Sequence, residues 1–471
     1  MIEELHKRLL DGKDIVEESI EKAHKYQKEY NSFVTIIDNP SKKTVNENIL
    51  SGIPYAAKDN LSTKDITTTG SSNILKNYVP FFNATAISKL NDSVLIGKTV
   101  LDELAMGGTG TTGHTGVVKN PWNKERIIGG SSSGSASCVA LGIVPFALGS
   151  DTGDSIRKPA IYSGIVGFKP TYGLISRYGL FPFACSLDHV GTLTRSVKDA
   201  AIVVDAIKGK DEKDLTSIES NYKLTDKITG DIKNKKLFYI KEIIEIEDND
   251  SEFIEIIKNY KENIQKLKNL GAIIEEISID RNLLKALYPS YFIISCAEAT
   301  SNNSNLTGIS FGSRVEGENA KETIFNTRTK GFSELIKRRF IIGSFVLQKE
   351  NQNRLYLNSC RIRRVIKDKF TLLFEKYDAL ILPGSGSVAP LIKTEILDKL
   401  SDKYLLLENH MIIANFGGFP SISIPTGFVN EMPIGISLTS GIRKDGELLN
   451  IAYTLENELK YKGQIAKGGN L

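Results

Sequence analysis

The order of hydrophobic and polar residues predicts helices and strands along most of the chain. Between residues 14 and 30, apolar positions such as Ile20 and Ala23 follow helical spacing. Asp14, with Glu17 three positions later, is typical of a helix N-terminus, where the acidic side chain caps a free backbone N–H. We therefore expect an amphipathic helix here that packs on the rest of the protein.

Residues 237 to 277 have the pattern of a strand, a helix and a second strand. LFYI is a short apolar run at the start, AIIEEISI is another near the end, and Gly271 between them is typical of a helix stop. The predicted helix carries an apolar stripe of Phe253, Ile257, Tyr260, Ile264 and Leu267. The segment is therefore predicted to be a βαβ unit.

The remaining segments extend this picture without dividing the chain. Residues 208 to 235 are polar and lysine-rich, as in a surface excursion, and residues 332 to 376 are predicted to be helical and basic. Three short β runs, YDALILPG, SISIPTG and PIGISL, precede a closing helix near 446 to 460. We find no repeats and no proline-rich linker.

Composition excludes several classes of protein. The 471 residues are 41% hydrophobic and 25% charged, and the mean hydropathy of -0.16 excludes both a disordered chain and a membrane bundle. Sixty basic against 56 acidic residues give a net charge of +4, too balanced for a dedicated nucleic-acid binder. A partner that handles RNA remains compatible with this charge.

Cysteine spacing and the N-terminal sequence indicate a cytoplasmic protein. The four cysteines lie far apart without a C-x-x-C pair, which indicates neither a zinc site nor a disulfide framework. The first residues, MIEELHKRLLDGKD, lack the apolar region of a secretory signal. The longest nearly apolar run, CVALGIVPFALG, has 12 residues, too few to span a bilayer, and is expected in the core.

The first stretch with chemical potential is IIGGSSSGSASCVALG, residues 127 to 142. A Gly/Ser loop that leads into a helix of small residues can bind phosphate through backbone N–H groups. The stretch has neither the G-K-[ST] ending nor the G-x-G-x-x-G pattern of nucleotide sites. Composition alone favours a structural loop over a phosphate cradle.

The second stretch is GIPYAAKDN, residues 52 to 60, where Lys58 follows an apolar pair. A lysine at the end of a buried strand acts as a base only if its pKa falls from about 10.4 toward 7, which burial among neutral groups achieves. Taken alone, Lys58 is more typical of an ordinary lysine at a strand end.

The third stretch is GSDTGDSIRKP, residues 149 to 159, which offers Ser155 as a nucleophile among backbone amides. Amide hydrolysis needs a nucleophile, a base and an oxyanion hole, and histidine is the usual base. None of the five histidines lies in a local signature of the Ser-His-Asp type. If Ser155 is a nucleophile, a serine and lysine arrangement is therefore the more economical one.

Taken together, AAKDN, GGSSSGS, GSDTGDSIRKPA and GIVGFKPTYGLISRYG resemble the amidase signature family. The resemblance implies an α/β fold with one large mixed, mostly parallel β-sheet core covered by helices on both faces. It also implies a single domain over 1–471. Its parts would be N-terminal helices (1–50), a catalytic core (51–205), the βαβ and helical part with the substrate clamp (206–376), and returning strands with a C-terminal helix (377–471).

That resemblance also implies a catalytic set, a Ser-cisSer-Lys triad. Ser155 would be the nucleophile, Ser131, with a cis peptide bond, would relay protons, and Lys58 would be the general base. The backbone N–H groups of Thr152, Gly153, Asp154 and Ser155 would form the oxyanion hole. No metal is implied, and Arg157 is expected to hold the loop rather than contact substrate.

Within the family the resemblance is closest to the glutaminase subunits of tRNA-dependent amidotransferases, and GFSELIKRRFIIGSFVL is its most specific stretch. By that resemblance Arg339 would hold the α-carboxylate of glutamine, as suits a forked guanidinium. Glu408 stands where those proteins have an aspartate for the α-amino group. On composition alone, the run of Lys337, Arg338 and Arg339 is more typical of a solvated helix face.

These expectations lead to three candidate functions. The first is a glutaminase that supplies ammonia to the B and C subunits of an amidotransferase, its partners, which would convert Glu-tRNA(Gln) to Gln-tRNA(Gln). This chain would bind no cofactor, and ATP and Mg²⁺ would act through the B subunit. The second is a stand-alone amide hydrolase without the glutamine clamp. The third is a scaffold that has lost activity.

Two replacements of family glycines, Ser133 and Asp154, bear on the third candidate. A carboxylate beside a developing oxyanion opposes catalysis unless it points away or pairs with a cation. We therefore expect Asp154 to turn outward, toward Arg157 or Lys158, with its N–H still facing the oxyanion hole.

Overall fold

The fold is organised around one large β-sheet. Within residues 1–41, 43–394 and 399–470, which the computed structural model describes, eleven strands form a single sheet. Their order is β1-β3-β2-β4-β6-β5-β10-β11-β9-β7-β8. The bounds are β1 (Phe33–Ile36), β2 (Pro54–Lys58), β3 (Val94–Thr99), β4 (Phe146–Asp151), β5 (Val166–Lys169), β6 (His189–Thr194), β7 (Lys236–Ile240), β8 (Ile273–Ile277), β9 (Ala379–Pro383), β10 (Ser421–Val429) and β11 (Met432–Thr439).

The strand directions confirm a mixed sheet, but the expectation that it is mostly parallel is wrong. Of the ten neighbouring pairs in the described residues, β2–β3, β2–β4, β7–β8 and β7–β9 are parallel, and the other six are antiparallel. One cause is the tight turn at Asn430 and Glu431, both with positive φ, which returns β10 directly into β11. Such turns produce antiparallel neighbours.

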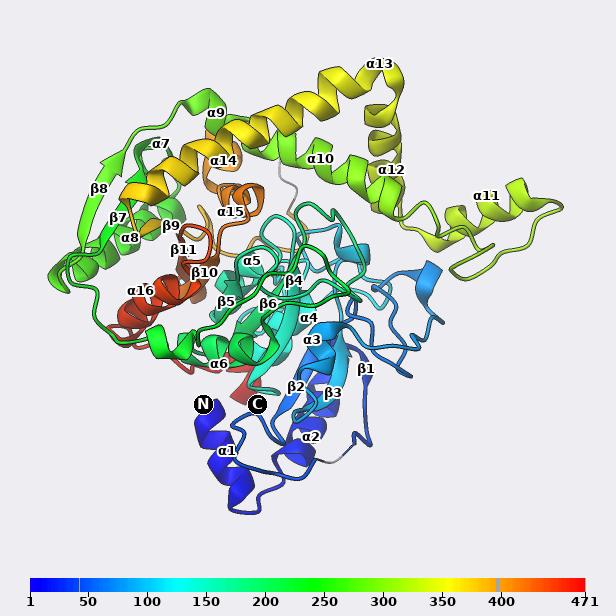
Figure 1. The fold of residues 1–471 in the computed structure, drawn as a ribbon, viewed down its shortest axis with the longest axis horizontal. Coiled ribbons are helices and arrows are strands. Elements are labelled where there is room, and N and C mark those ends of the chain that lie inside the picture. The colour runs from blue at the N-terminus through cyan, green and yellow to red at the C-terminus, as the bar shows by residue number, and fades with distance from the viewer. Residues whose placement is uncertain (42, 395–398, 471) are drawn as a thin grey trace.

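The helices surround the sheet as Figure 1 shows, with α11 projecting away from the body of the molecule and the two chain ends close together. Their bounds are α1 (Ile2–Leu10), α2 (Ile15–Tyr30), α3 (Thr85–Ser88), α4 (Ser133–Ala140), α5 (Arg157–Ser163), α6 (Val197–Ile207), α7 (Lys241–Ile244), α8 (Ser251–Asn269), α9 (Arg281–Lys285), α10 (Leu287–Asn302), α11 (Ala320–Gly331), α12 (Glu334–Leu347), α13 (Lys349–Gln352), α14 (Asn358–Lys376), α15 (Ile412–Gly417) and α16 (Asp445–Asn457).

Helices cover both faces of the sheet, as expected. Alternation along β2 shows this: Tyr55 and Ala57 contribute to one apolar cluster with residues of α6 and α16, whereas Ala56 contributes to another with residues of α4 and α5. The two clusters lie on opposite sides of the same strand. The two-faced cover explains why β2, β4 and β6 are buried along their whole length.

Several elements predicted from hydrophobic periodicity are confirmed. Asp14 caps α2 by accepting a hydrogen bond from the N–H of Glu17. The predicted βαβ unit is β7, α8 and β8, its strands are parallel, and all five residues of the expected apolar stripe on α8 are buried. The three C-terminal β runs are β9, β10 and β11, and the closing helix is α16.

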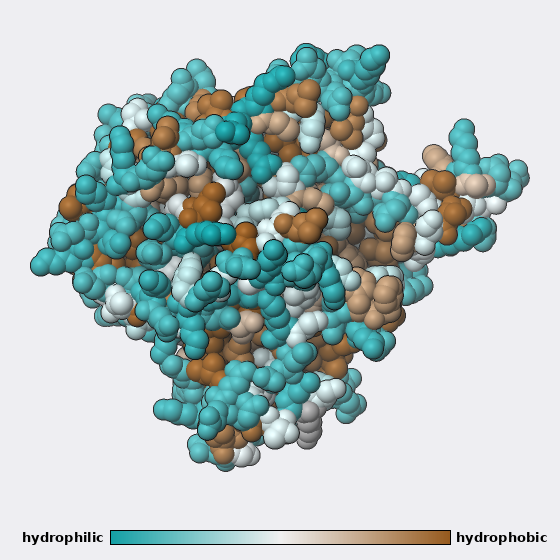
Figure 2. All heavy atoms as spheres, in the orientation of Figure 1, coloured by the Kyte–Doolittle hydropathy of each residue, from teal (hydrophilic) through white to brown (hydrophobic). Residues whose placement is uncertain are grey.

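The surface is mainly polar, with separate apolar patches. Figure 2 shows hydrophilic residues over most of the visible face and a hydrophobic patch on the projecting arm around α11. Phe325 on α11, together with Ile309 and Phe311 just before it, is among the exposed apolar side chains. Within the described residues, no helix is long and apolar enough to cross a membrane.

Candidate active site

Lys58 lies at the end of β2, between β3 and β4, and its side chain is fully buried. Its Nζ donates hydrogen bonds to the Oγ atoms of Ser131 (2.8 Å), Ser150 (2.9 Å) and Ser132 (3.0 Å), and to the backbone O of Ser150 (3.2 Å). All four partner atoms are neutral. The structure thus brings together the predicted base and the predicted relay serine, which lie on different segments of the chain.

The environment of Lys58 favours the neutral amine. Burial lowers the pKa of Lys58 to about 7, although the charges of Asp102, Asp151 and Asp188 oppose the shift. A substantial fraction of neutral amine near pH 7 gives the side chain the lone pair that a general base needs. The pKa of Lys58 is therefore lowered as far as a role as general base requires.

The loop before α4 brings Ser131 into contact with Lys58. The peptide bond between Gly130 and Ser131 is cis, as the family resemblance implied. A Cβ on Gly130 would lie 2.0 Å from Oδ2 of Asp102, so the close approach of this carboxylate requires glycine. Asp102 in turn accepts hydrogen bonds from the N–H groups of residues 109 to 112. The carboxylate thus anchors two loops around the serine.

Ser155 lies in the turn between β4 and α5, next to this loop. The N–H of Ser132 donates to the backbone O of Ser155 at 3.0 Å, so the two serine-bearing segments are in direct contact. Ser133, at a position where the family resemblance implies glycine, donates its hydroxyl to the backbone O of Val100 at 3.3 Å. The hydroxyl of Ser133 is therefore hydrogen-bonded to the backbone of a neighbouring segment and not to the Lys58 amine.

Arg157 holds the turn, as expected. Its guanidinium is fully buried and pairs with the carboxylate of Asp151 at 3.0 Å, while it also donates to the backbone O of Gly153 and the side chain of Asn415. Although burial raises the pKa of a carboxyl group, the charge of Arg157 holds the pKa of Asp151 below its ordinary value. The Arg157–Asp151 ion pair therefore fixes the conformation of the turn.

The predicted oxyanion-hole segment has free backbone donors. The N–H groups of Gly153, Asp154 and Ser155 donate to no acceptor in the described part of the chain. The N–H of Thr152 likewise donates to no acceptor among the described residues, and its hydroxyl donates to Oδ1 of Asp188 at 2.7 Å. A Cβ on Gly153 would lie 2.9 Å from the ring of Tyr291, so this position also requires glycine.

Asp154 forms no ion pair with Arg157 or Lys158, the two cations toward which it is expected to turn. Arg157 is paired with Asp151, and Lys158 is paired with Glu408 instead. The carboxylate of Asp154 makes no hydrogen bond or ion pair within the described residues, and Asp154 alone of residues 152–155 is not buried. Surrounding protein atoms still raise the pKa of Asp154 to about 6, against the opposing charge of Lys158.

Arg339, on α12, is not on a solvated helix face. Its guanidinium lies 5.1 Å from the ring centre of Phe292 and 5.6 Å from that of Phe183. Nη1 contacts Sγ of Cys296 at 3.9 Å, and the buried Nε has no hydrogen-bond partner among the described residues. The side chain is therefore a cation without a carboxylate partner in the described structure.

Glu408 follows the turn at Lys403–Leu407, and both of its carboxylate oxygens are engaged. Oε2 lies 2.8 Å from Nζ of Lys158, and Oε1 accepts a hydrogen bond from the N–H of Gly386 at 2.7 Å. Burial alone would lower the pKa of Lys158, but the charge of Glu408 raises it above its ordinary value. The carboxylate of Glu408, which the resemblance assigns to the substrate amino group, is thus already paired with Lys158.

Sequence reasoning assigned no role to Ser150 or Tyr291 and did not predict the pairing of Lys158 with Glu408. Ser150 supplies two of the four acceptors around Lys58, and Lys158 neutralises Glu408. Tyr291, from α10, packs on Gly153, and burial raises its pKa well above the ordinary value, with Arg339 opposing and Asp154 adding to the shift. Ser150 and Lys158 lie within GSDTGDSIRKP, whereas no motif in the sequence around Tyr291 indicates its place at the site.

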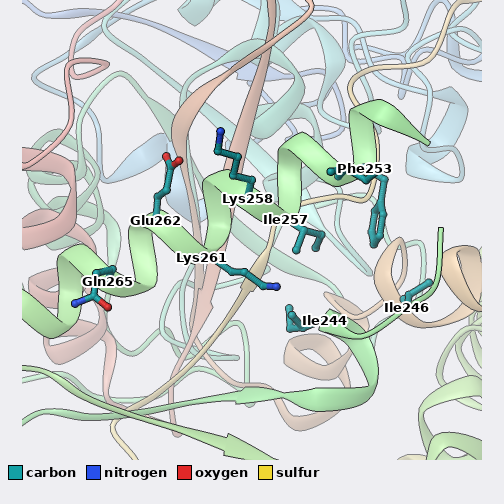
Figure 3. Close-up of a pocket in the computed structure, with 9 residues that line it drawn as sticks. Ile244, Ile246, Phe253, Ile257, Lys258, Lys261, Glu262 and Gln265 are labelled. Carbon is teal, nitrogen blue, oxygen red and sulfur yellow. The ribbon is translucent and has the colours of Figure 1, made fainter. Parts of the chain in front are cut away.

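A separate pocket lies away from these residues. It is formed by α7 and α8, and Figure 3 shows Ile244, Phe253 and Ile257 lining it together with Lys261. None of the predicted site residues lines it. Among the described residues, no three His, Cys, Asp or Glu side chains come together in a way that could hold a metal ion.

Comparisons with known proteins agree with the motif resemblance. The family model described as Amidase matches residues 14–449. The chain is 36% identical to the A subunit of glutamyl-tRNA(Gln) amidotransferase from Sulfurisphaera tokodaii, over 98% of this chain and 97% of that one. It is 39% identical to the protein of the same name from Streptococcus pneumoniae, again over 98% and 97%.

A solved structure gives the same result. The crystal structure of the A subunit of glutamyl-tRNA(Gln) amidotransferase from Thermotoga maritima is 35% identical and superposes with a TM-score of 0.79, covering 95% of this chain and 92% of that one. Sequence and fold therefore agree over nearly the whole length. The chain belongs to the amidase family and is similar along nearly its whole length to amidotransferase A subunits.

Proposed function

We propose that this protein is the glutamine-hydrolysing component of a tRNA-dependent amidotransferase. Ser155 is the nucleophile, Ser131 relays protons, and Lys58 is the general base. The observation that carries the proposal is the fully buried Lys58 amine, which is held 2.8 Å from Ser131 and whose hydrogen-bond acceptors in the described part of the chain are all neutral. A buried lysine without a counter-ion is costly to keep, which favours a catalytic role.

In the proposed reaction the neutral amine of Lys58 takes the proton of Ser131, while Ser131 takes that of Ser155. Oγ of Ser155 attacks the carboxamide carbon of glutamine, and the N–H groups of Thr152, Gly153, Asp154 and Ser155 accommodate the oxyanion. The proton then returns to the leaving nitrogen, so ammonia departs and an acyl-enzyme remains. Water releases glutamate by the same relay.

The proposal assigns the ammonia to partner proteins. The named relatives are the A subunits of glutamyl-tRNA(Gln) amidotransferases. By that relationship a B subunit would use ATP and Mg²⁺ to activate the glutamate of Glu-tRNA(Gln) and amidate it, and a C subunit would complete a cytoplasmic heterotrimer. This chain would bind glutamine and no cofactor, and contact the tRNA mainly through the B subunit.

One observation favours the second candidate, a stand-alone amide hydrolase. Glu408, the expected partner of the glutamine α-amino group, is already neutralised by Lys158. Purification of the chain with the proteins that accompany it separates the two. The proposal predicts two further proteins in the complex and release of ammonia from glutamine. A chain that purifies alone and hydrolyses simple amides better than glutamine would contradict it.

A further inference from the structure

The charges of three neighbouring side chains, Asp154, Lys158 and Glu408, do not balance. Asp154 and Glu408 act on Lys158 together, but only Glu408 contacts it, at 2.8 Å. When both acids are ionised, the group of Asp154, Lys158 and Glu408 carries one uncompensated negative charge. Asp154 carries it, because Glu408 is engaged by Lys158 and by the N–H of Gly386.

An uncompensated positive charge, that of Arg339, also acts on Tyr291. This tyrosine packs on Gly153, and the charges of both Arg339 and Asp154 act on its hydroxyl group. Arg339 has aromatic rings around it, no carboxylate partner in the described residues, and a buried Nε without an acceptor. The site thus carries an unmatched cation and an unmatched anion, as a zwitterionic ligand requires.

We propose that Asp154, rather than Glu408, binds the α-ammonium group of the substrate and makes the site selective for amides that carry one. This inference rests on the proposed glutaminase function and names the residue that sets its substrate class. Lys158 and Glu408 then form a neutral pair that borders the ammonium subsite without contributing net charge to it.

The dimensions of glutamine fit this position. Four covalent bonds of about 1.5 Å separate the carboxamide carbon from the α-nitrogen, so the two atoms are at most roughly 5 Å apart. Asp154 directly precedes Ser155, and the Cα atoms of consecutive residues are about 3.8 Å apart. An ammonium group beside Asp154 is therefore within reach when the carboxamide lies at the nucleophile.

The same contact also removes the conflict between Asp154 and the oxyanion. A free carboxylate beside the developing negative charge raises the barrier to attack, whereas a carboxylate paired with an ammonium group does not. Amides without an ammonium group leave Asp154 unpaired next to the oxyanion. Selectivity therefore acts on the chemical step as well as on binding.

The test compares glutamine with glutaramic acid, which has the same carboxamide and carboxylate but no amino group. The readout is the ratio of kcat/KM for the two amides, measured on the full chain with its accompanying proteins. We expect wild type to favour glutamine and Asp154→Asn to lower the ratio by roughly tenfold to a hundredfold, the range of one charged hydrogen bond. Asp154→Gly, which any backbone conformation accepts, should lower it similarly.

The matched control is the double variant Lys158→Gln with Glu408→Gln, which removes the ion pair as a neutral unit. The inference predicts that this variant keeps the preference for glutamine. A ratio unchanged in both Asp154 variants, or a ratio lost only in the double variant, would overturn it. Failure of wild type to hydrolyse either amide would instead overturn the proposed function, so the two failures are distinguishable.

Discussion

Nζ of Lys58 lies 2.8 Å from Oγ of Ser131, although 73 positions separate the two residues in the chain. The strand end at β2 and the loop before α4 meet at this contact, and the turn with Ser155 touches the same loop through Ser132. The hydrogen bonds of this amine within the described residues go to hydroxyl and carbonyl oxygens. A buried amine joined in this way to a serine is the arrangement that a general base requires.

Replacement of Lys58 by methionine removes the base and keeps the volume. We expect kcat/KM for glutamine to fall by roughly 10²- to 10⁴-fold, the usual contribution of a general base. Because the amine is buried among neutral hydrogen-bond acceptors, its loss should leave the melting temperature unchanged or higher. Ammonia release and thermal unfolding measure the two effects, and an active variant that melts lower would contradict both.

The pH dependence of kcat/KM should report the titration of Lys58. Burial lowers the pKa of Lys58 to about 7, and only the neutral amine accepts a proton. The rate should therefore rise with pH through about 7, by roughly tenfold per unit on the acidic side, and then level off. A profile that is flat between pH 6 and 8 would exclude Lys58 as the base.

Ser150 acts through Lys58 and is a positioning residue. Its Oγ accepts a hydrogen bond from the lysine amine at 2.9 Å and thereby favours the charged form. Ser150→Ala should lower kcat/KM roughly five- to tenfold, the size of one hydrogen bond, and move the rise of the pH profile to lower pH. Ser135→Ala is the matched control, since Ser135 bonds to Thr99 and Leu148 instead. A purely structural role would leave the profile in place.

Arg339 should determine affinity for glutamine. Its replacement by alanine removes the unpartnered cation, and we expect KM to rise roughly tenfold to a hundredfold with a smaller change in kcat. Arg338→Ala is the control on the same helix, because Arg338 is exposed. Steady-state ammonia release over a range of glutamine concentrations measures both. Equal effects of the two substitutions would contradict a role of Arg339 in binding glutamine.

The sequence predicted the parts of the site that lie within local motifs. The resemblance of short motifs to the amidase signature family points to Lys58, Ser131 and Ser155, and the neutral environment of Lys58 follows from the serine-rich loops beside it. Elements with clear periodicity, such as α2 and α8, were also predictable, since their apolar stripes are visible in the sequence.

Relationships between distant segments were not predictable from the sequence. Lys158 and Glu408 lie 250 positions apart, so nothing local indicates that they pair. The direction of the strands depends likewise on which ones become neighbours: β6 inserts between β4 and β5 and runs antiparallel to both. The hydrophobic pattern of a strand predicts which side chains face the core, but it does not predict which strands lie beside it.

The most direct measurement is covalent labelling with a fluorophosphonate, in which the nucleophilic serine displaces fluoride at phosphorus. Peptide mass spectrometry of the assembled protein locates the adduct. The proposed function predicts one adduct, on Ser155, with loss of glutamine hydrolysis in proportion to labelling, and no adduct in the Lys58→Met variant. An unlabelled Ser155 in a preparation that still releases ammonia from glutamine, or an adduct on Ser155 that forms equally without Lys58, would contradict it.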